Sequence, residues 1–212
     1  MILIGQFDSP FVRRVAITLE LYGMPYEHRP WSVFGDADKI AAHSPARRVP
    51  VLVLDDGEVL IESAAILDAL DQLAGADRAL TPVAGAERRR ALKICALASN
   101  VADKVVALIY ERLLHDVTSP VWIARCGDQI RGLLDALEAE RVGGGSPWWS
   151  GERLSQVDIT VGCVLRFLSE AQASLFDPAI WPALAAHGAR CEALPVFQSI
   201  QQPFYVTPPR KE

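Results

Sequence analysis

The chain has 212 residues, of which 50% are hydrophobic and 22% charged, a composition that indicates a globular protein and excludes a disordered one. Its formal net charge of −5 argues against a nucleic-acid partner, because binding phosphates requires a concentrated basic face. No apolar run is long enough for a membrane-spanning helix, and the four widely spaced cysteines indicate free thiols in a cytoplasmic protein without a structural metal.

The first third of the chain alternates short strands and helices. The apolar run 2–4 predicts a buried strand, and Ser9 and Pro10 predict a helix start, since serine is a favoured N-cap and proline fits the first helical turn. Gly23 and Pro25 predict the end of this helix. Residues 26–29 then predict a second strand, parallel to the first because a helix connects them.

A short helix over 36–42 comes next, followed by a hairpin. Two β-rich runs, 51–54 and 59–61, flank an Asp-Gly turn, which is a strong hairpin signal. A further helix begins near Ser63 and ends at Gly75. The predicted element order of the first part of the chain is therefore βαβαββα.

Everything after Pro82 is expected to be helical. The first long helix, 87–113, carries an apolar stripe that is expected to be buried, and a second helix covers 121–137. The members of the stripe are Leu92, Cys95, Ala96, Ser99, Ala102, Val106 and Ile109. Gly, Asp, Thr and Pro accumulate between 75 and 82, which places a boundary between a domain of residues 1–76 and an all-helical domain of residues 83–212.

A third helix of the second domain has a clear start signal. Ser155 and Asp158 have the spacing of a capping box, in which each side chain pairs with the other residue's backbone N–H. We expect this pair to be structural.

Four segments in this order resemble cytosolic glutathione transferases over essentially the whole chain. They are residues 9–15 (SPFVRRV), 44–52 (SPARRVPVL), 61–66 (IESAAI) and the capping box. The resemblance implies a thioredoxin-like N-terminal domain followed by an all-α domain, with glutathione as co-substrate and no metal. It also implies a homodimer, and a second substrate that is a small hydrophobic electrophile.

The resemblance places the Ser9 hydroxyl beside the glutathione sulfur, as a serine-type catalytic residue. Without it, Ser9 is only a helix N-cap. The chemistry favours a donor at this position, because the thiolate is the nucleophile and a hydrogen bond stabilises it over the thiol.

Two further segments would hold the rest of glutathione. From the residues alone, Pro50 is expected to follow a trans bond, and Glu62 and Ser63 to form the polar start of a helix. By resemblance the bond before Pro50 is cis and the Val49 backbone pairs with the cysteinyl part of glutathione, while Glu62 faces the γ-glutamyl ammonium and Ser63 the γ-glutamyl carboxylate. Arg48 is favoured over Arg47 for the glycyl carboxylate.

The electrophile is expected to bind along the helix 87–113. Candidate lining residues, which ordinary helix packing also explains, are Asn100, Asp103, Val106 and Tyr110.

Departures from the family's sequence pattern narrow the set of reactions that we expect. Neither tyrosine nor cysteine stands at the Ser9 position, and Asp8 stands where maleylacetoacetate isomerase-like relatives tend to have a second serine, which makes isomerisation less expected. Conjugation, dehalogenation and peroxide reduction share the same thiolate and stay open. The alternative from another class is a catalytically silent scaffold that keeps the fold for protein association.

Overall fold

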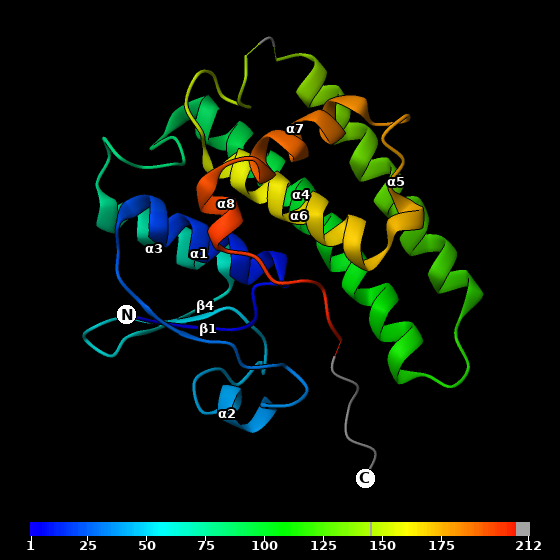
Figure 1. The fold of residues 1–212 in the computed structure, drawn as a ribbon, viewed down its shortest axis with the longest axis horizontal. Coiled ribbons are helices and arrows are strands. Elements are labelled where there is room, and N and C mark those ends of the chain that lie inside the picture. The colour runs from blue at the N-terminus through cyan, green and yellow to red at the C-terminus, as the bar shows by residue number, and fades with distance from the viewer. Residues whose placement is uncertain (145, 207–212) are drawn as a thin grey trace. The chain divides into compact units, whose positions relative to one another are not determined.

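The computed structural model describes residues 1–144 and 146–206, which form two compact units (Figure 1). The first contains Met1–Ala79 and the described residues from Pro195 onward, and the second contains Leu80–Leu194. The division into functional domains of residues 1–76 and 83–212 stays a prediction. Nothing in the sequence pattern indicated that the C-terminal residues belong to the first unit.

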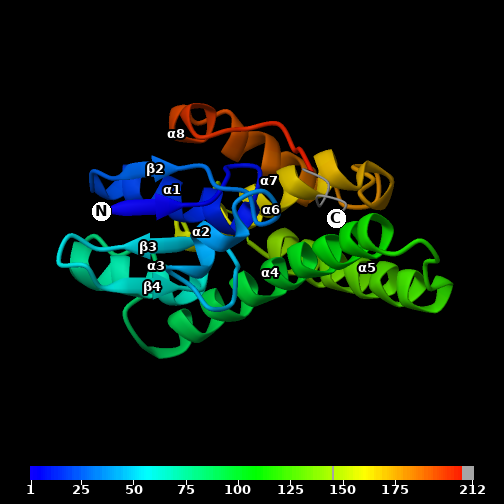
Figure 2. The ribbon, with the colours of Figure 1, turned by 90° about the horizontal axis from the view of Figure 1, so that it is seen from below.

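The first unit confirms the βαβαββα order. Its elements are β1 (Ile2–Ile4), α1 (Pro10–Tyr22), β2 (Glu27–Arg29), α2 (Ala37–Ala41), β3 (Val51–Val53), β4 (Val59–Ile61) and α3 (Ser63–Ala74), joined by the C-terminal α8 (Pro195–Ser199). The strands lie in the order β2-β1-β3-β4 (Figure 2). β1 pairs parallel with β2 and antiparallel with β3, and β3 pairs antiparallel with β4.

Helices cover both faces of this sheet, with α1 and α3 on one side and α2 on the other (Figure 1). Ile4 and Val51 pack with Ile40 of α2 in one buried cluster. Leu3 and Leu52 are also fully buried, and because side chains alternate along a strand they face α1 and α3. The two central strands, β1 and β3, are buried on both faces, which explains why they are apolar runs rather than alternating patterns.

The second unit is helical, as predicted. It contains α4 (Gly85–Leu114), α5 (Pro120–Val142), α6 (Gln156–Ala171), the 3₁₀ turn η1 (Ala173–Leu175) and α7 (Pro182–Glu192). α4 packs against α5 and α6, and α7 packs against the same two helices. No helix in the described part of the chain is both long enough and apolar enough to cross a membrane.

The buried face of α4 differs from the predicted stripe. Of the seven predicted residues only Ala102 is fully buried, and Leu92 is 47% exposed. The buried row is instead Ala91, Ile94, Ala98, Val101, Ala102, Val105 and Leu108. α4 meets two helices and is apolar over a wide arc, so two overlapping rows fit the helical period and the sequence pattern selected the wrong one.

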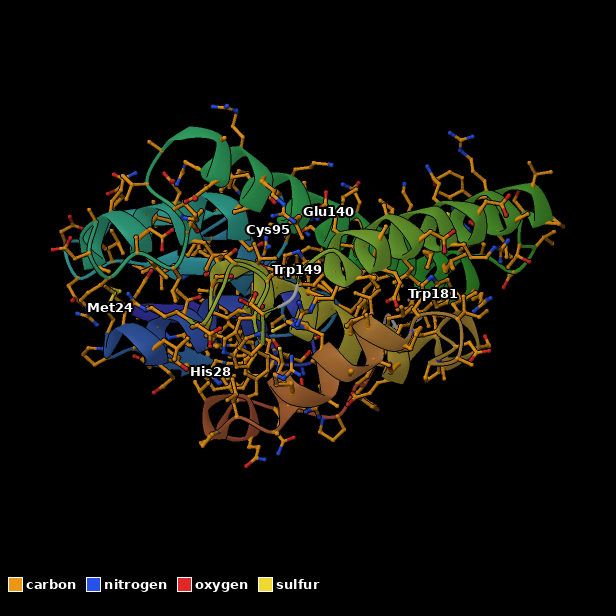
Figure 3. All side chains as sticks on the ribbon, turned by 90° about the horizontal axis from the view of Figure 1, so that it is seen from above. Met24, His28, Cys95, Glu140, Trp149 and Trp181 are labelled. Atoms are coloured by element: carbon orange, nitrogen blue, oxygen red, sulfur yellow. The ribbon has the colours of Figure 1, made fainter. Side chains whose placement is uncertain are left out.

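The start of α6 is held by Asp158, which is completely buried. Its carboxylate accepts the Ser155 N–H at 2.8 Å and the Ser155 hydroxyl at 2.6 Å, and its other oxygen accepts the Trp149 N–H at 2.7 Å. Trp149 is 4% exposed and lies inside the helical unit (Figure 3). Asp158 therefore joins the loop before α6 to the first turn of that helix.

Candidate functional site

Ser9 stands at the N-cap of α1 with its hydroxyl unused by the helix. Its backbone is extended, with φ −71° and ψ 121°, and its carbonyl accepts the Arg13 N–H at 2.9 Å. An N-cap serine ordinarily accepts a backbone N–H with its side chain, but here the Ser9 side chain makes no cap hydrogen bond within the described chain. Ser9 is half-buried, and its side chain stands at the positive end of the α1 dipole.

Gly5, at the end of β1, allows α1 and the loop before β3 to approach each other closely. Its φ is +128°, and a Cβ at this position would lie 2.5 Å from the Val12 side chain and 2.9 Å from the Val49 Cβ. Only glycine fits both this backbone conformation and this spacing. The approach brings Val49 next to the helix that Ser9 begins.

Val49 precedes β3 and is joined to Pro50 by a cis peptide bond. Neither the N–H nor the C=O of Val49 is hydrogen-bonded to any other residue in the ranges 1–144 and 146–206. Val49 thus offers one donor and one acceptor, which is what an extended peptide needs in order to pair as an added strand.

The N-terminus of α3 carries the acidic and hydroxyl groups that were predicted as a pair. Glu62 is the N-cap with φ 65°, an uncommon conformation for a residue other than glycine. Its carboxylate is exposed and lies 3.6 Å from the Arg48 guanidinium. Ser63 is 3% exposed, and its hydroxyl accepts a hydrogen bond of 2.5 Å from Arg14 of α1.

These contacts bring Arg48, Glu62 and Ser63 together and place Arg14 beside Ser63. Arg48 lies beside Glu62, whereas Arg47 lies 3.5 Å from Asp38. Arg14, which the sequence analysis did not select, is only 4% exposed and links α1 to Ser63. Its signal in the sequence was an arginine pair inside an otherwise apolar helix, since a buried guanidinium requires polar partners.

The predicted electrophile residues lie on α4, outside its fully buried row. Asn100 is exposed and donates to the Ala96 carbonyl at 2.8 Å. Asp103 is exposed, and Val106 and Tyr110 are half-buried. Within the described residues, no group of three or more His, Cys, Asp or Glu side chains is placed to hold a metal ion.

Comparison with known proteins agrees with this geometry. Residues 3–78 match the family model "Glutathione S-transferase, N-terminal domain", and residues 120–190 match "Glutathione S-transferase, C-terminal domain". The probable glutathione S-transferase GSTU1 of Oryza sativa subsp. japonica is 30% identical over 205 residues, which cover 90% of this chain and 84% of the relative.

Two solved structures extend the similarity to the whole chain. A glutathione S-transferase of Methylobacterium radiotolerans, in complex with glutathione sulfonate, superposes with a TM-score of 0.91 at 30% identity, covering 100% of this chain and 99% of the other. A glutathione transferase family member of Pseudomonas fluorescens Pf-5, with bound glutathione, has a TM-score of 0.82 at 28% identity and covers 96% and 99% of the two chains.

Proposed function

The chain belongs to the glutathione S-transferase family and is a glutathione transferase; we propose that it ionises the glutathione thiol at Ser9 and transfers the thiolate to a small hydrophobic electrophile. The observation that carries this proposal is the Ser9 hydroxyl at the N-terminus of α1, which makes no cap hydrogen bond in the described part of the chain.

The interaction energies indicate that one hydroxyl at a helix N-terminus is sufficient to ionise the thiol. A free thiol has a pKa of about 8.5, so only about 3% of it is thiolate at pH 7. Lowering the pKa by about two units requires about 2.7 kcal/mol of preferential stabilisation of the thiolate. A hydrogen bond to a charged group supplies about 1.5–3 kcal/mol, and a helix N-terminus adds about 0.3–1 kcal/mol. No separate general base is required.

The remaining groups match the two ends of glutathione. In our proposal Val49 pairs with the cysteinyl backbone as an added strand. The N-terminus of α3, with the Ser63 N–H and hydroxyl, takes the γ-glutamyl carboxylate, because N–H groups and the helix dipole favour an anion there. Glu62 takes the γ-glutamyl ammonium and Arg48 the glycyl carboxylate, so that ligand binding exchanges the Arg48–Glu62 ion pair for two pairs with glutathione.

The chemical step then needs only the thiolate and an electrophilic carbon. The thiol proton leaves to solvent, the sulfur lone pair forms the new S–C bond, and the electron pair of the broken bond departs with the leaving group or moves into the conjugated system. We propose the exposed and half-buried face of α4 as the electrophile wall, formed by Asn100, Asp103, Val106 and Tyr110. Dehalogenation, isomerisation and peroxide reduction would start from the same thiolate.

We also propose that the enzyme is a cytoplasmic homodimer with domains 1–76 and 83–212, and that it acts in detoxification. Light scattering of the purified protein at micromolar concentration tests the assembly, with twice the mass of the chain as the expected result.

The experiment for the proposed function is a rate measurement with glutathione and a panel containing an aryl halide, a conjugated enone and an organic peroxide. We expect the wild-type protein to consume glutathione with at least one of them. We expect Ser9→Ala to lose about 25-fold in rate at pH 7, because a two-unit rise in the thiol pKa lowers the thiolate fraction from about 76% to about 3%. Ser150→Ala, at an exposed serine of the second unit, is the matched control. A wild-type protein that does not bind glutathione would instead support the scaffold alternative.

A further inference from the structure

The C-terminal segment 197–205 runs beside the loop that carries Ser9, nearly 190 residues away in sequence. Arg13, one turn into α1, anchors it. Arg13 is 2% exposed and donates from Nε to the Ile200 carbonyl at 2.7 Å and from Nη2 to the Phe197 carbonyl at 2.8 Å. Its guanidinium also lies 5.3 Å from the centre of the buried Phe197 ring. The segment is therefore tied to the same helix that Ser9 begins.

Beyond this anchor the segment is hydrogen-bonded to both residues that precede Ser9. The Phe7 N–H donates to the Gln202 side-chain carbonyl at 3.2 Å. The Tyr205 N–H donates to the Asp8 carboxylate at 3.2 Å. The Phe7 backbone and the Asp8 side chain, on the N-terminal side of Ser9, are thus held by groups from the C-terminal segment.

A hollow in the surface lies beside this loop. A surface cavity of about 580 Å³ is lined by Phe7, His28, Ile200 and residues of the α1–β2 turn that include Met24 (His28 and Met24 are labelled in Figure 3). The Phe7 ring stacks on the His28 ring at 3.8 Å, and His28 donates from Nε2 to the Gly5 carbonyl at 2.8 Å. The Phe7 side chain is thus held by the His28 ring, whereas its backbone N–H is held by Gln202.

We propose that Gln202 is a positioning residue for Ser9: by accepting the Phe7 N–H, it fixes the loop so that the Ser9 hydroxyl points at the glutathione sulfur. The effect on catalysis rests on the proposed function, whereas the effect on the loop does not. A thiolate hydrogen bond weakens steeply with distance and angle, and a displacement of about 1 Å at a reacting group costs up to about 100-fold in rate.

Amide hydrogen exchange of the whole protein tests the loop without any ligand. In Gln202→Met, which keeps the length of the side chain but has no carbonyl, we expect the Phe7 N–H to exchange about 10-fold faster. In Gln202→Glu, whose carboxylate is an acceptor, we expect wild-type protection. Gln72→Met, at an exposed glutamine of α3, is the control for the substitution itself. Equal Phe7 protection in Gln202→Met and wild type overturns the proposal.

Kinetics then test the consequence for Ser9. In Gln202→Met we expect kcat to fall about 3- to 10-fold, the KM for glutathione to stay within about twofold, and the acidic limb of the pH–kcat profile to move up by about 0.5 pH unit. Gln202→Glu is left out of the pH comparison because its charge alone would raise the thiol pKa. Faster exchange with unchanged kinetics overturns the positioning role. Faster exchange in a protein whose wild type forms no thiolate leaves the support of the loop in place and refutes the proposed function.

Discussion

The Arg14 guanidinium, buried in α1, donates a hydrogen bond of 2.5 Å to the Ser63 hydroxyl at the start of α3. The two residues are 49 positions apart and belong to the two helices on one face of the sheet. The contact fixes Ser63 beside a permanent positive charge. Both features favour an anion at the N-terminus of α3, where we propose the γ-glutamyl carboxylate binds.

Substituting Arg14 is therefore expected to weaken glutathione binding without removing any group of the thiol site. Lysine keeps the charge but not the planar fork, so Arg14→Lys should raise the Kd for glutathione about 10-fold in calorimetric titration. Arg131→Lys, at an exposed arginine of α5 that pairs with Asp128, should leave the Kd unchanged because exposed ion pairs contribute little. Equal affinities in wild type and Arg14→Lys would contradict a role for this contact in binding.

The two candidates for binding the glycyl carboxylate form different ion pairs: Arg48 pairs with Glu62, and Arg47 pairs with Asp38. We expect Arg48→Ala to weaken glutathione binding about 10-fold and Arg47→Ala to change it less than about twofold. γ-Glutamylcysteine, which lacks the glycyl residue, should bind wild type and Arg48→Ala with similar affinity. If Arg47→Ala has the larger effect, the assignment made from the motif register is wrong.

The order of the elements was predictable because strands, turns and helix ends carry local signals such as the Asp-Gly turn and the Ser9-Pro10 start. The buried row of α4 was not, because its wide apolar arc fits two rows and only the packing of α5 and α6 selects one. The Arg14–Ser63 and Phe7–Gln202 contacts were not predictable either. Each joins residues that only the folded chain brings together, and no spacing rule connects them.

The buried His187 of α7 predicts how stability responds to acid. Burial, together with the nearby positive charges of Arg141 and Arg190, lowers its pKa to about 4, from about 6.5. The unfolded chain therefore binds a proton at higher pH than the folded protein does. The contribution of His187 is complete above about pH 6.5 and is lost as the pH falls toward 4, by about 3 kcal/mol in total.

In the His187→Gln variant, the free energy of unfolding should fall less steeply as the pH is lowered from 7 to 4. Urea unfolding of wild type at a series of pH values between 7 and 4 should show a steeper loss of unfolding free energy than the variant shows. Burial raises the pKa of the neighbouring Asp158, which favours the folded state as the pH falls, so that group acts in the opposite direction and is present in both proteins. Parallel pH curves would show that His187 is not held neutral.

The ionisation of bound glutathione tests the role of Ser9 most directly. The thiolate absorbance of glutathione would be followed against pH in complexes with wild type, Ser9→Ala and the Ser150→Ala control. We predict a thiol pKa about two units below that of free glutathione in wild type and control, and a pKa close to the free value in Ser9→Ala with glutathione still bound. A bound thiol that titrates identically in wild type and Ser9→Ala would show that the Ser9 hydroxyl does not ionise glutathione.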